Sequence, residues 1–552
     1  YDGKSIFGRL RWQDHEDIMS RKNDLWARPR KSPREYLSLA VEGMVNLFKL
    51  NQADRDLRGA LRSVLGLDAA EIVISSSPAA PAGLDPSQSR AWTASVDERN
   101  PVVLIQGPPG TGKTSVLEKV VRTLCARKKR ILVAAPSNTA VDNICRRLMD
   151  DLPVLRFGRN QESIAPEVAQ RCWIGIDDNV RDYSLKHKRM NCGGVFIGTH
   201  VGLIRDDIIM EDINRNGLYD VIVYDEAGMA SMQEFFLSCR MGNRVVLFGD
   251  HHQLPPFPLP QSVAERNLKE YGPVTNCQDA IVRQSALEWL ATIRNFPIIM
   301  LQCSYRCQNP RLLRFASTLF YDAGVKASDR AEYYRLPYSE RQRKYSPGSL
   351  MLLQTSDLPA ELRNENFVLE GCKPGLENRL EAALCCRTVY DAMSRYPLRE
   401  ITVISPYRRQ IRLIRGMLSR ERAATALGRA VGEKEWEAFL FSRIATVDSF
   451  QGGESDIVII SYVRSPQGGG IGFVDDANRI NVAHTRCRRE MVVIGDMTSL
   501  KANARNNIFV RMERAFCRDG RIEKITESEA RRVCDEFTVP EEAKPNVAAL
   551  VV

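Results

Sequence analysis

The stretch VVLIQGPPGTGKT, residues 102–114, decides the fold of this chain. Its first five residues are apolar and largely β-branched, which predicts a short buried strand. A glycine-rich turn follows and opens into an amphipathic run from Ser115 to Leu124, which predicts a helix. A strand, a glycine-rich turn and a helix N-terminus in this order present backbone N–H groups to a polyphosphate.

The side chains of the turn fit the same ligand. Glycines let the backbone approach the phosphates, Lys113 neutralises the β- and γ-phosphate charges, and the Thr114 hydroxyl ligates Mg²⁺. The sequence therefore predicts a nucleoside triphosphate site. Its predicted residues in this stretch are Gly107, Pro108, Pro109, Gly110, Thr111, Gly112, Lys113, Thr114 and Ser115.

Composition places the chain among large globular enzymes. It has 552 residues, 44% hydrophobic and 26% charged, which predicts two to four domains. The longest apolar runs have the length of a strand, so no membrane span is predicted. The 14 cysteines form no C-x-x-C pair, which favours a reducing compartment without structural zinc. The net charge of +10 permits a polyanionic partner.

Two blocks of alternating strand and helix signals predict an α/β fold. Apolar strands separated by helices are typical of doubly wound parallel sheets, here one sheet per block, and two facing sheets would form a cleft. Ligands of such sheets bind where the strands end. The first block has strands near 102–106, 131–135, 195–199, 221–225 and 244–249. The second has strands near 298–301, 401–405, 444–447, 456–463 and 491–495.

The predicted domains follow from these blocks. A helical N-terminal segment covers 1–83, the first α/β domain 84–262, the second 263–500, and a C-terminal tail 501–552. Small insertions are expected near 151–193 and 325–375, and a proline-rich linker at Pro255–Pro260. Because the chain begins at Tyr1 instead of Met, we expect it to be a fragment.

An acidic pair ends one of the predicted strands of the first block. Val221–Tyr224 is followed by Asp225 and Glu226, about 110 residues after the phosphate loop. Asp225 is predicted to hold Mg²⁺, and Glu226 to orient or deprotonate the attacking water.

The next predicted strand ends in GDHHQLPP, residues 249–256. This pattern, after DEAG and GPPGTGKT, resembles superfamily 1 class B helicases of the up-frameshift and senataxin-like branch. The resemblance covers about residues 84–500 and implies two RecA-like domains that face each other across an ATP cleft. It assigns Gln253 to sensing the γ-phosphate.

Further motifs in the first block match the same family. Gln88, in LDPSQSRAW, matches the glutamine that reads adenine; a rival at Leu50-Asn51-Gln52 is too far from the loop. The run APSNTAVD and the triplet GTH match segments that contact the nucleic-acid backbone. They contribute the predicted contact residues Pro136, Ser137, Asn138, Thr139 and Thr199.

The second block continues the match. SYR at 304–306 resembles the QYR motif, with Ser in place of Gln, and implies that Tyr305 stacks on adenine while Arg306 reaches the γ-phosphate. ISPYRRQ and TVDSFQGGE supply Pro406, Thr446 and Ser449 for nucleic acid, and Glu454 near the ribose.

RINVAHTRCR, residues 479–488, resembles RxNVAxTRxR, in which Arg486 is a second arginine finger. The arginines come from one domain and Lys113 from the other. Hydrolysis is therefore expected to depend on domain closure, which would couple it to translocation. The predicted catalytic residues are Lys113, Asp225, Glu226, Gln253, Arg306 and Arg486.

The leading hypothesis is an ATP- and Mg²⁺-dependent helicase or translocase on single-stranded RNA, moving 5′ to 3′ as the resemblance implies. The DEAG variant resembles the Armitage-like helicases of RNA silencing and favours RNA. A DNA helicase of the same branch and an ATP-gated nucleic-acid clamp stay open. We expect an intracellular protein, cytoplasmic or nuclear, that meets protein partners through regions outside this chain.

Overall fold

The computed structural model describes residues 60–65, 72–74, 79–158, 161–174, 194–204, 206–256, 284–329, 337–370, 373–450, 453–466 and 468–538. These residues form two compact units. The second begins at Met300 and also includes two short segments, Gly107–Lys113 and His252–Leu254. The other described residues before Met300 form the first unit.

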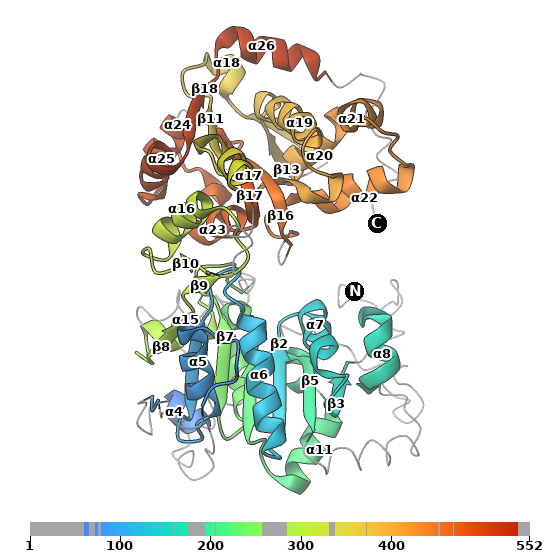
Figure 1. Ribbon diagram of the computed structural model, residues 1–552, viewed down its shortest axis with the longest axis vertical. Coiled ribbons are helices and arrows are strands. Elements are labelled where there is room, and N and C mark those ends of the chain that lie inside the picture. The colour runs from blue at the N-terminus through green and yellow to red at the C-terminus, as the bar shows by residue number, and fades with distance from the viewer. Residues whose placement is uncertain are drawn as a thin grey trace, which may run out of the picture. The chain divides into compact units, whose positions relative to one another are not determined.

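The first unit is built on an eight-stranded sheet (Figure 1) with the order β4-β3-β5-β2-β6-β7-β1-β8. All neighbours from β4 to β1 pair in parallel. The strands are β1 Val102–Gln106, β2 Ile131–Ala135, β3 Val154–Phe157, β4 Trp173–Ile174, β5 Val195–Thr199, β6 Val221–Tyr224, β7 Val245–Gly249 and β8 Ile298–Met300.

Helices alternate with these strands along the chain, as a doubly wound sheet requires. In β1, β2, β6 and β7 every residue is buried, so both faces of the sheet are covered. The helices are α4 Ala60–Leu65, α5 Pro86–Val96, α6 Lys113–Ala126, α7 Asn138–Leu148, α8 Pro166–Cys172, α10 His200–Ile204, α11 Asp207–Asn216, α12 Met232–Cys239 and α15 Ala286–Thr292, with short 3₁₀ helices η1 Gln161–Ser163 and η2 Ala227–Met229.

The second unit has a six-stranded sheet with the order β15-β14-β16-β17-β11-β18, parallel throughout. Its strands are β11 Leu350–Gln354, β14 Ile401–Ser405, β15 Ile444–Thr446, β16 Ser455–Ser461, β17 Cys487–Gly495 and β18 Arg521–Lys524. Two small ladders accompany it, β9 Cys303–Ser304 with β10 Lys326–Ala327, and β12 Asn366–Glu370 with β13 Lys373–Glu377.

Side-chain alternation along the central strand β16 produces two cores in this unit. Val458 and Ile460 pack into one cluster with α16 and α25, while Ile457 and Ile459 pack into another with α19 and α20. The helices are α16 Pro310–Phe320, α17 Tyr338–Lys344, α18 Ala360–Arg363, α19 Arg379–Met393, α20 Arg408–Met417, α21 Arg420–Leu427, α22 Glu433–Arg443, α23 Ala477–His484, α24 Met497–Asn503, α25 Ile508–Asp519 and α26 Glu527–Glu536, with η4 Pro347–Ser349, η5 Leu398–Glu400 and η6 Gly472–Asp475.

The predicted α/β fold with two parallel sheets is confirmed, but one strand assignment, one expected insertion and the expected tail are corrected. The strand near 298–301, placed in the second block, is β8 and joins the first sheet. The expected insertion at 325–375 contains β11, which lies between β17 and β18 in the second sheet. The expected tail contains β18 and two helices of the second unit. Pairing partners far apart in the chain decide these placements, and local periodicity does not report them.

The expected insertion at 151–193 likewise contributes sheet, because β3 and β4 extend the first one. The rival glutamine at 50–52 and most of the proline-rich linker lie outside the described residues, as does the predicted N-terminal helix up to residue 59. Within the part of the chain that is described, no helix combines the length and the apolar character needed to cross a membrane.

Candidate functional site

The predicted phosphate loop runs from the end of β1 to the start of α6. Gly110 and Gly112 have φ values of +77° and +79°, a backbone conformation that favours glycine. A Cβ atom at Gly107 would lie 2.0 Å from Cγ of Lys113, so the lysine side chain folds back over the loop. The Thr111 hydroxyl donates to the Pro108 carbonyl at 2.7 Å and closes the turn. This cradle fits a phosphate group beside the lysine.

The acidic pair follows β6, at the edge where the strands of the first sheet end. Asp225 is buried, and one of its carboxylate oxygens accepts from the Glu226 backbone N–H at 3.0 Å. Glu226 has a left-handed backbone, with φ +50° and ψ +39°. Such strain at a non-glycine residue is typical of functional sites. It supports the catalytic prediction for Glu226.

Two glycines bring the ends of β6 and β7 together next to this pair. A Cβ atom at Gly228 would lie 2.5 Å from the carbonyl oxygen of Asp250, and one at Gly249 would lie 2.6 Å from the Gly228 nitrogen. Asp250 is buried and accepts from the side-chain amide of Gln106, at the end of β1, at 3.4 Å. The glycines of the DEAG and GD motifs therefore serve close backbone packing.

The predicted nucleic-acid residues of the first unit lie along the same edge, on the neighbouring strands. Ala135 at the end of β2 pairs with Thr199 at the end of β5. Ser137 caps α7 by accepting from the Ala140 N–H at 3.2 Å. The Thr199 hydroxyl accepts from the Gly202 N–H at 3.1 Å. In the strand order, β6 lies between β2 on one side and β7 and β1 on the other. One edge of the sheet therefore carries the residues predicted to bind polyphosphate, after β1 and β6, and beside them the residues predicted to bind nucleic acid, after β2 and β5.

A buried arginine, which the sequence analysis did not single out, positions the predicted nucleic-acid residues at the start of α7. Arg156 of β3 is fully buried and pairs with Asp142 of α7 at 3.0 Å. It also donates to the side-chain oxygen of Asn138 at 2.8 Å. Arg156 thus fixes the start of α7, where Ser137, Asn138 and Thr139 lie. A single Arg in a short strand gives no sequence signal for this role.

Gln88 has a local structural partner. It is the third residue of α5 and forms a capping box with Asp85, whose backbone N–H donates to the Gln88 side-chain oxygen at 3.2 Å. The LDPSQ stretch is therefore a helix start as well as a match to the adenine-reading motif.

In the second unit, Arg486 is buried and held on several sides. Its guanidinium donates to the carbonyl of Val482 at 3.1 Å and to the side-chain oxygen of Gln253 at 3.2 Å. The neighbouring Asn481 donates to the carbonyl of His252 at 2.7 Å. The structure therefore brings together Gln253 and Arg486, which the sequence assigned to the same phosphate.

Arg306 and Glu454 form an ion pair of 2.5 Å between Nε and Oε2. Glu454 also faces Arg488, whose Nη1 lies 3.4 Å from it. The sequence assigned Arg306 to the γ-phosphate and Glu454 to the ribose, and their contact with each other was not predicted. The backbone N–H of Tyr305 donates to the Gly110 carbonyl at 2.8 Å, so the SYR segment contacts the phosphate loop.

The predicted residues of the second sheet occupy two opposite edges. Pro406 follows the end of β14, whose last residue pairs with Thr446 at the end of β15. Glu454 and Arg486 immediately precede β16 and β17, whose first residues pair with each other. The expectation that ligands bind where strands end therefore fits Pro406 and Thr446, but not Glu454 and Arg486.

A buried polar network lies beneath the loop that carries Pro406. The side chain of Gln410 bonds to the backbone of Asn378 and, at 3.1 Å, to the Ser461 hydroxyl. That hydroxyl donates to Glu381 at 2.6 Å, and the Val463 N–H donates to the same oxygen at 2.8 Å. Burial raises the pKa of Glu381 to about 8 in spite of these bonds. The Gln of the ISPYRRQ motif is therefore a structural bridge.

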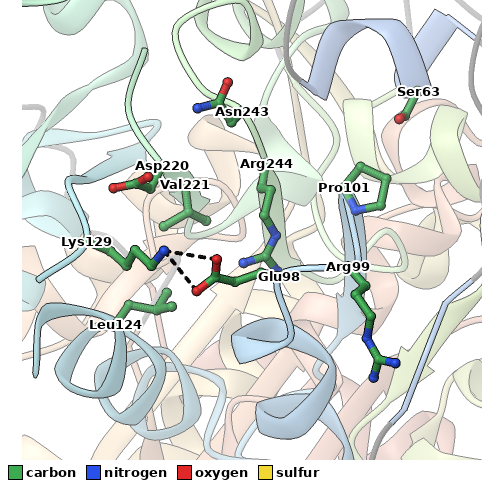
Figure 2. A pocket seen from close by; sticks show the side chains of 10 residues that line it. All are labelled: Ser63, Glu98, Arg99, Pro101, Leu124, Lys129, Asp220, Val221, Asn243 and Arg244. Carbon is green, nitrogen blue, oxygen red and sulfur yellow. Dashed lines mark hydrogen bonds and ion pairs between the residues drawn. The ribbon is translucent and has the colours of Figure 1, made fainter. Parts of the chain in front are cut away.

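A polar pocket of about 510 Å³ lies in the first unit, at the opposite edge of its sheet (Figure 2). Pro101, Val221 and Arg244 lie where β1, β6 and β7 begin. Lys129 pairs with Glu98 at 2.9 Å across the pocket, and Arg244 donates to two backbone carbonyls. None of the residues predicted for the site lines this pocket, and its charges have internal partners. It is therefore a structural feature.

Comparison with known proteins finds two matching family models and several curated relatives. Two family models, each described as an AAA domain, match residues 282–498 and residues 83–192 with 204–259. The ATP-dependent helicase NAM7 of Saccharomyces cerevisiae is 28% identical over 79% of this chain and 44% of its own length.

Two further relatives carry names that refer to DNA. The DNA replication ATP-dependent helicase/nuclease DNA2 of the same yeast is 27% identical over 72% of this chain and 25% of its own length. The DNA-binding protein SMUBP-2 of Rattus norvegicus is 27% identical over 76% of this chain and 44% of its own length. The chain spans less than half the length of each of these curated relatives.

Proposed function

This chain belongs to the superfamily 1 helicases of the up-frameshift-like branch, and we propose that it hydrolyses ATP to translocate along single-stranded RNA in the 5′ to 3′ direction. One observation carries the proposal. The first sheet has the phosphate loop after β1, the acidic pair after β6 and the polar residues Ser137–Thr139 after β2, all on one edge. A conformational change at the bound nucleotide would thus occur next to side chains suited to binding nucleic-acid phosphates.

In this proposal the phosphate loop and the acidic pair bind the nucleotide and activate the attacking water. The loop N–H groups and Lys113 hold the phosphates, and Glu226 takes the proton of the attacking water. Thr114 and Asp225 have the oxygen ligands that Mg²⁺ prefers, and the bound ion would neutralise charge on the β- and γ-phosphates. Gln88 and Tyr305 are proposed to contact the adenine, and Glu454 the ribose.

The residues of the second unit supply positive charge. Arg306 and Arg486 are proposed to stabilise the γ-phosphoryl group as its charge spreads over three oxygens. Arg486 is held in place by the carbonyl of Val482 and by Gln253, which pre-organises its guanidinium. Arg306 is paired with Glu454, so it is proposed to exchange this carboxylate for phosphate when nucleotide binds.

The choice of RNA over DNA rests on the resemblance of the DEAG sequence to RNA-silencing helicases. Phosphate contacts alone do not read the 2′-hydroxyl. The names of two relatives refer to DNA, and they favour a DNA helicase as the second candidate.

The deciding experiment is ATP hydrolysis without nucleic acid, with single-stranded RNA and with single-stranded DNA, with Glu226→Gln as the blank. Stimulation by RNA alone supports the proposal, and a duplex with either a 5′ or a 3′ overhang then gives the direction. Equal stimulation by single-stranded DNA would mean that the chain acts on either nucleic acid. Tight nucleotide-dependent binding without stimulation would make the chain an ATP-gated clamp.

A further inference from the structure

An exposed phenylalanine lies beside the predicted nucleic-acid residues of the second unit. Phe473, in η6, keeps 54% of its surface exposed. The sequence gives it no role, because a lone Phe in a glycine-rich loop has no periodicity. Its surroundings decide what it can bind.

The ring is placed by two neighbours. The guanidinium of Arg479 lies over it, 5.0 Å from the ring centroid, and the Tyr407 ring lies 6.0 Å away at an angle of 59°. The Tyr407 hydroxyl donates to the carbonyl of Ile471 at 3.3 Å, which fixes the chain just before η6. Phe473 is therefore held in position while more than half of it remains accessible.

These neighbours connect the ring to the residues that the sequence assigned to nucleic acid. Tyr407 follows Pro406 directly. Arg479 pairs at 3.3 Å with Asp448, which lies between Thr446 and Ser449, and the hydroxyls of these two residues are 2.8 Å apart. Phe473 thus belongs to one continuous surface with all three predicted residues of this unit.

An accessible aromatic ring beside phosphate-binding hydroxyls and a guanidinium is the arrangement that grips a single strand. Bases stack on such rings whatever their identity, because every base has a π-face. We propose that Phe473 is a stacking platform for an unpaired base of single-stranded nucleic acid, with Arg479 holding the ring. This inference rests on the proposed function, because it needs a single strand across this surface.

The chain offers a closely matched control. Phe441 is 57% exposed, and the guanidinium of Arg415 lies 5.0 Å from its ring centroid. Phe441 lies in α22, next to the start of β15, whereas Thr446 lies at the other end of that strand. Removal of Phe441 therefore deletes the same kind of exposed ring without touching the proposed surface.

The test measures binding of a labelled single strand by fluorescence anisotropy. Phe473→Ala should weaken binding roughly 5- to 100-fold, the loss of one stacked base, and Phe441→Ala should leave it unchanged. An abasic strand has the same phosphates without bases, so wild type and Phe473→Ala should bind it equally. The salt dependence should also be equal, because no phosphate contact is lost.

A second variant keeps the test decisive if Phe473→Ala does not fold. Phe473→Trp should bind like wild type, and its fluorescence should be quenched by the strand, unlike that of Phe441→Trp. If wild type binds the strand but Phe473→Ala binds like Phe441→Ala, or the new tryptophan is not quenched, the stacking role is overturned. If wild type binds no single strand, the proposed function and this inference both fail.

Discussion

Replacement of the buried Glu381 by Gln tests whether this carboxyl group is uncharged in the polar network that also contains Gln410 and Ser461. Burial raises the pKa of this carboxyl from 4.5 to about 8. Between these two pH values the carboxyl group therefore stays protonated in the folded state but is ionised in the unfolded state. The stability that this group contributes is fully present below about pH 4.5 and is lost as the pH rises toward 8.

The size of the effect follows from the two pKa values. Between them, each pH unit changes the free energy of unfolding by about 1.4 kcal/mol. From pH 5.5 to pH 7.5 the wild-type chain should therefore lose about 2 to 3 kcal/mol through Glu381. The Gln side chain still accepts from the Ser461 hydroxyl and the Val463 N–H but does not titrate. The stability of Glu381→Gln relative to wild type should therefore rise by that amount over this range.

Urea unfolding followed by tryptophan fluorescence measures this difference. Trp436 is the single tryptophan from residue 300 onward, so a parallel Trp436→Phe chain gives the background from the rest of the molecule. Glu437→Gln, on the exposed side of α22, is the control for loss of a carboxylate. If the midpoints of wild type and Glu381→Gln shift in parallel from pH 5.5 to 7.5, Glu381 is ionised in the folded state and the reasoning is wrong.

Four further substitutions test the proposed site and its support. Glu226→Gln should bind ATP normally and hydrolyse it about 10²- to 10⁴-fold more slowly, and normal turnover would remove its role as base. Lys113→Ala should weaken nucleotide binding itself, as measured by titration with a fluorescent ATP analogue. Arg486→Ala should lower kcat by about 10³-fold while the Kd for ATP changes little, whereas an unchanged rate excludes the arginine finger. Arg156→Met should cost about 3 to 5 kcal/mol in urea unfolding by leaving Asp142 buried and unpaired, and a cost below 1 kcal/mol would contradict the buried ion pair.

The sequence alone determined the elements whose signals are local. The apolar run at 102–106 and the glycines after it predict a strand and a phosphate loop, because the chain there allows few other conformations. The pair Asp225-Glu226 could be placed at a strand end for the same reason. Motif order then predicted roles for Gln253, Arg306 and Arg486, none of which gives a signal on its own.

Tertiary structure decided whatever depends on partners distant in the chain. Local patterning marked 298–301 as a strand but could not assign it to the first sheet, and it missed β11, which β17 and β18 enclose. The ion pair of Arg306 with Glu454 joins residues almost 150 positions apart. The support of Asn138 by Arg156 and the exposure of Phe473 are likewise set by packing, because they depend on which side chains the fold brings near.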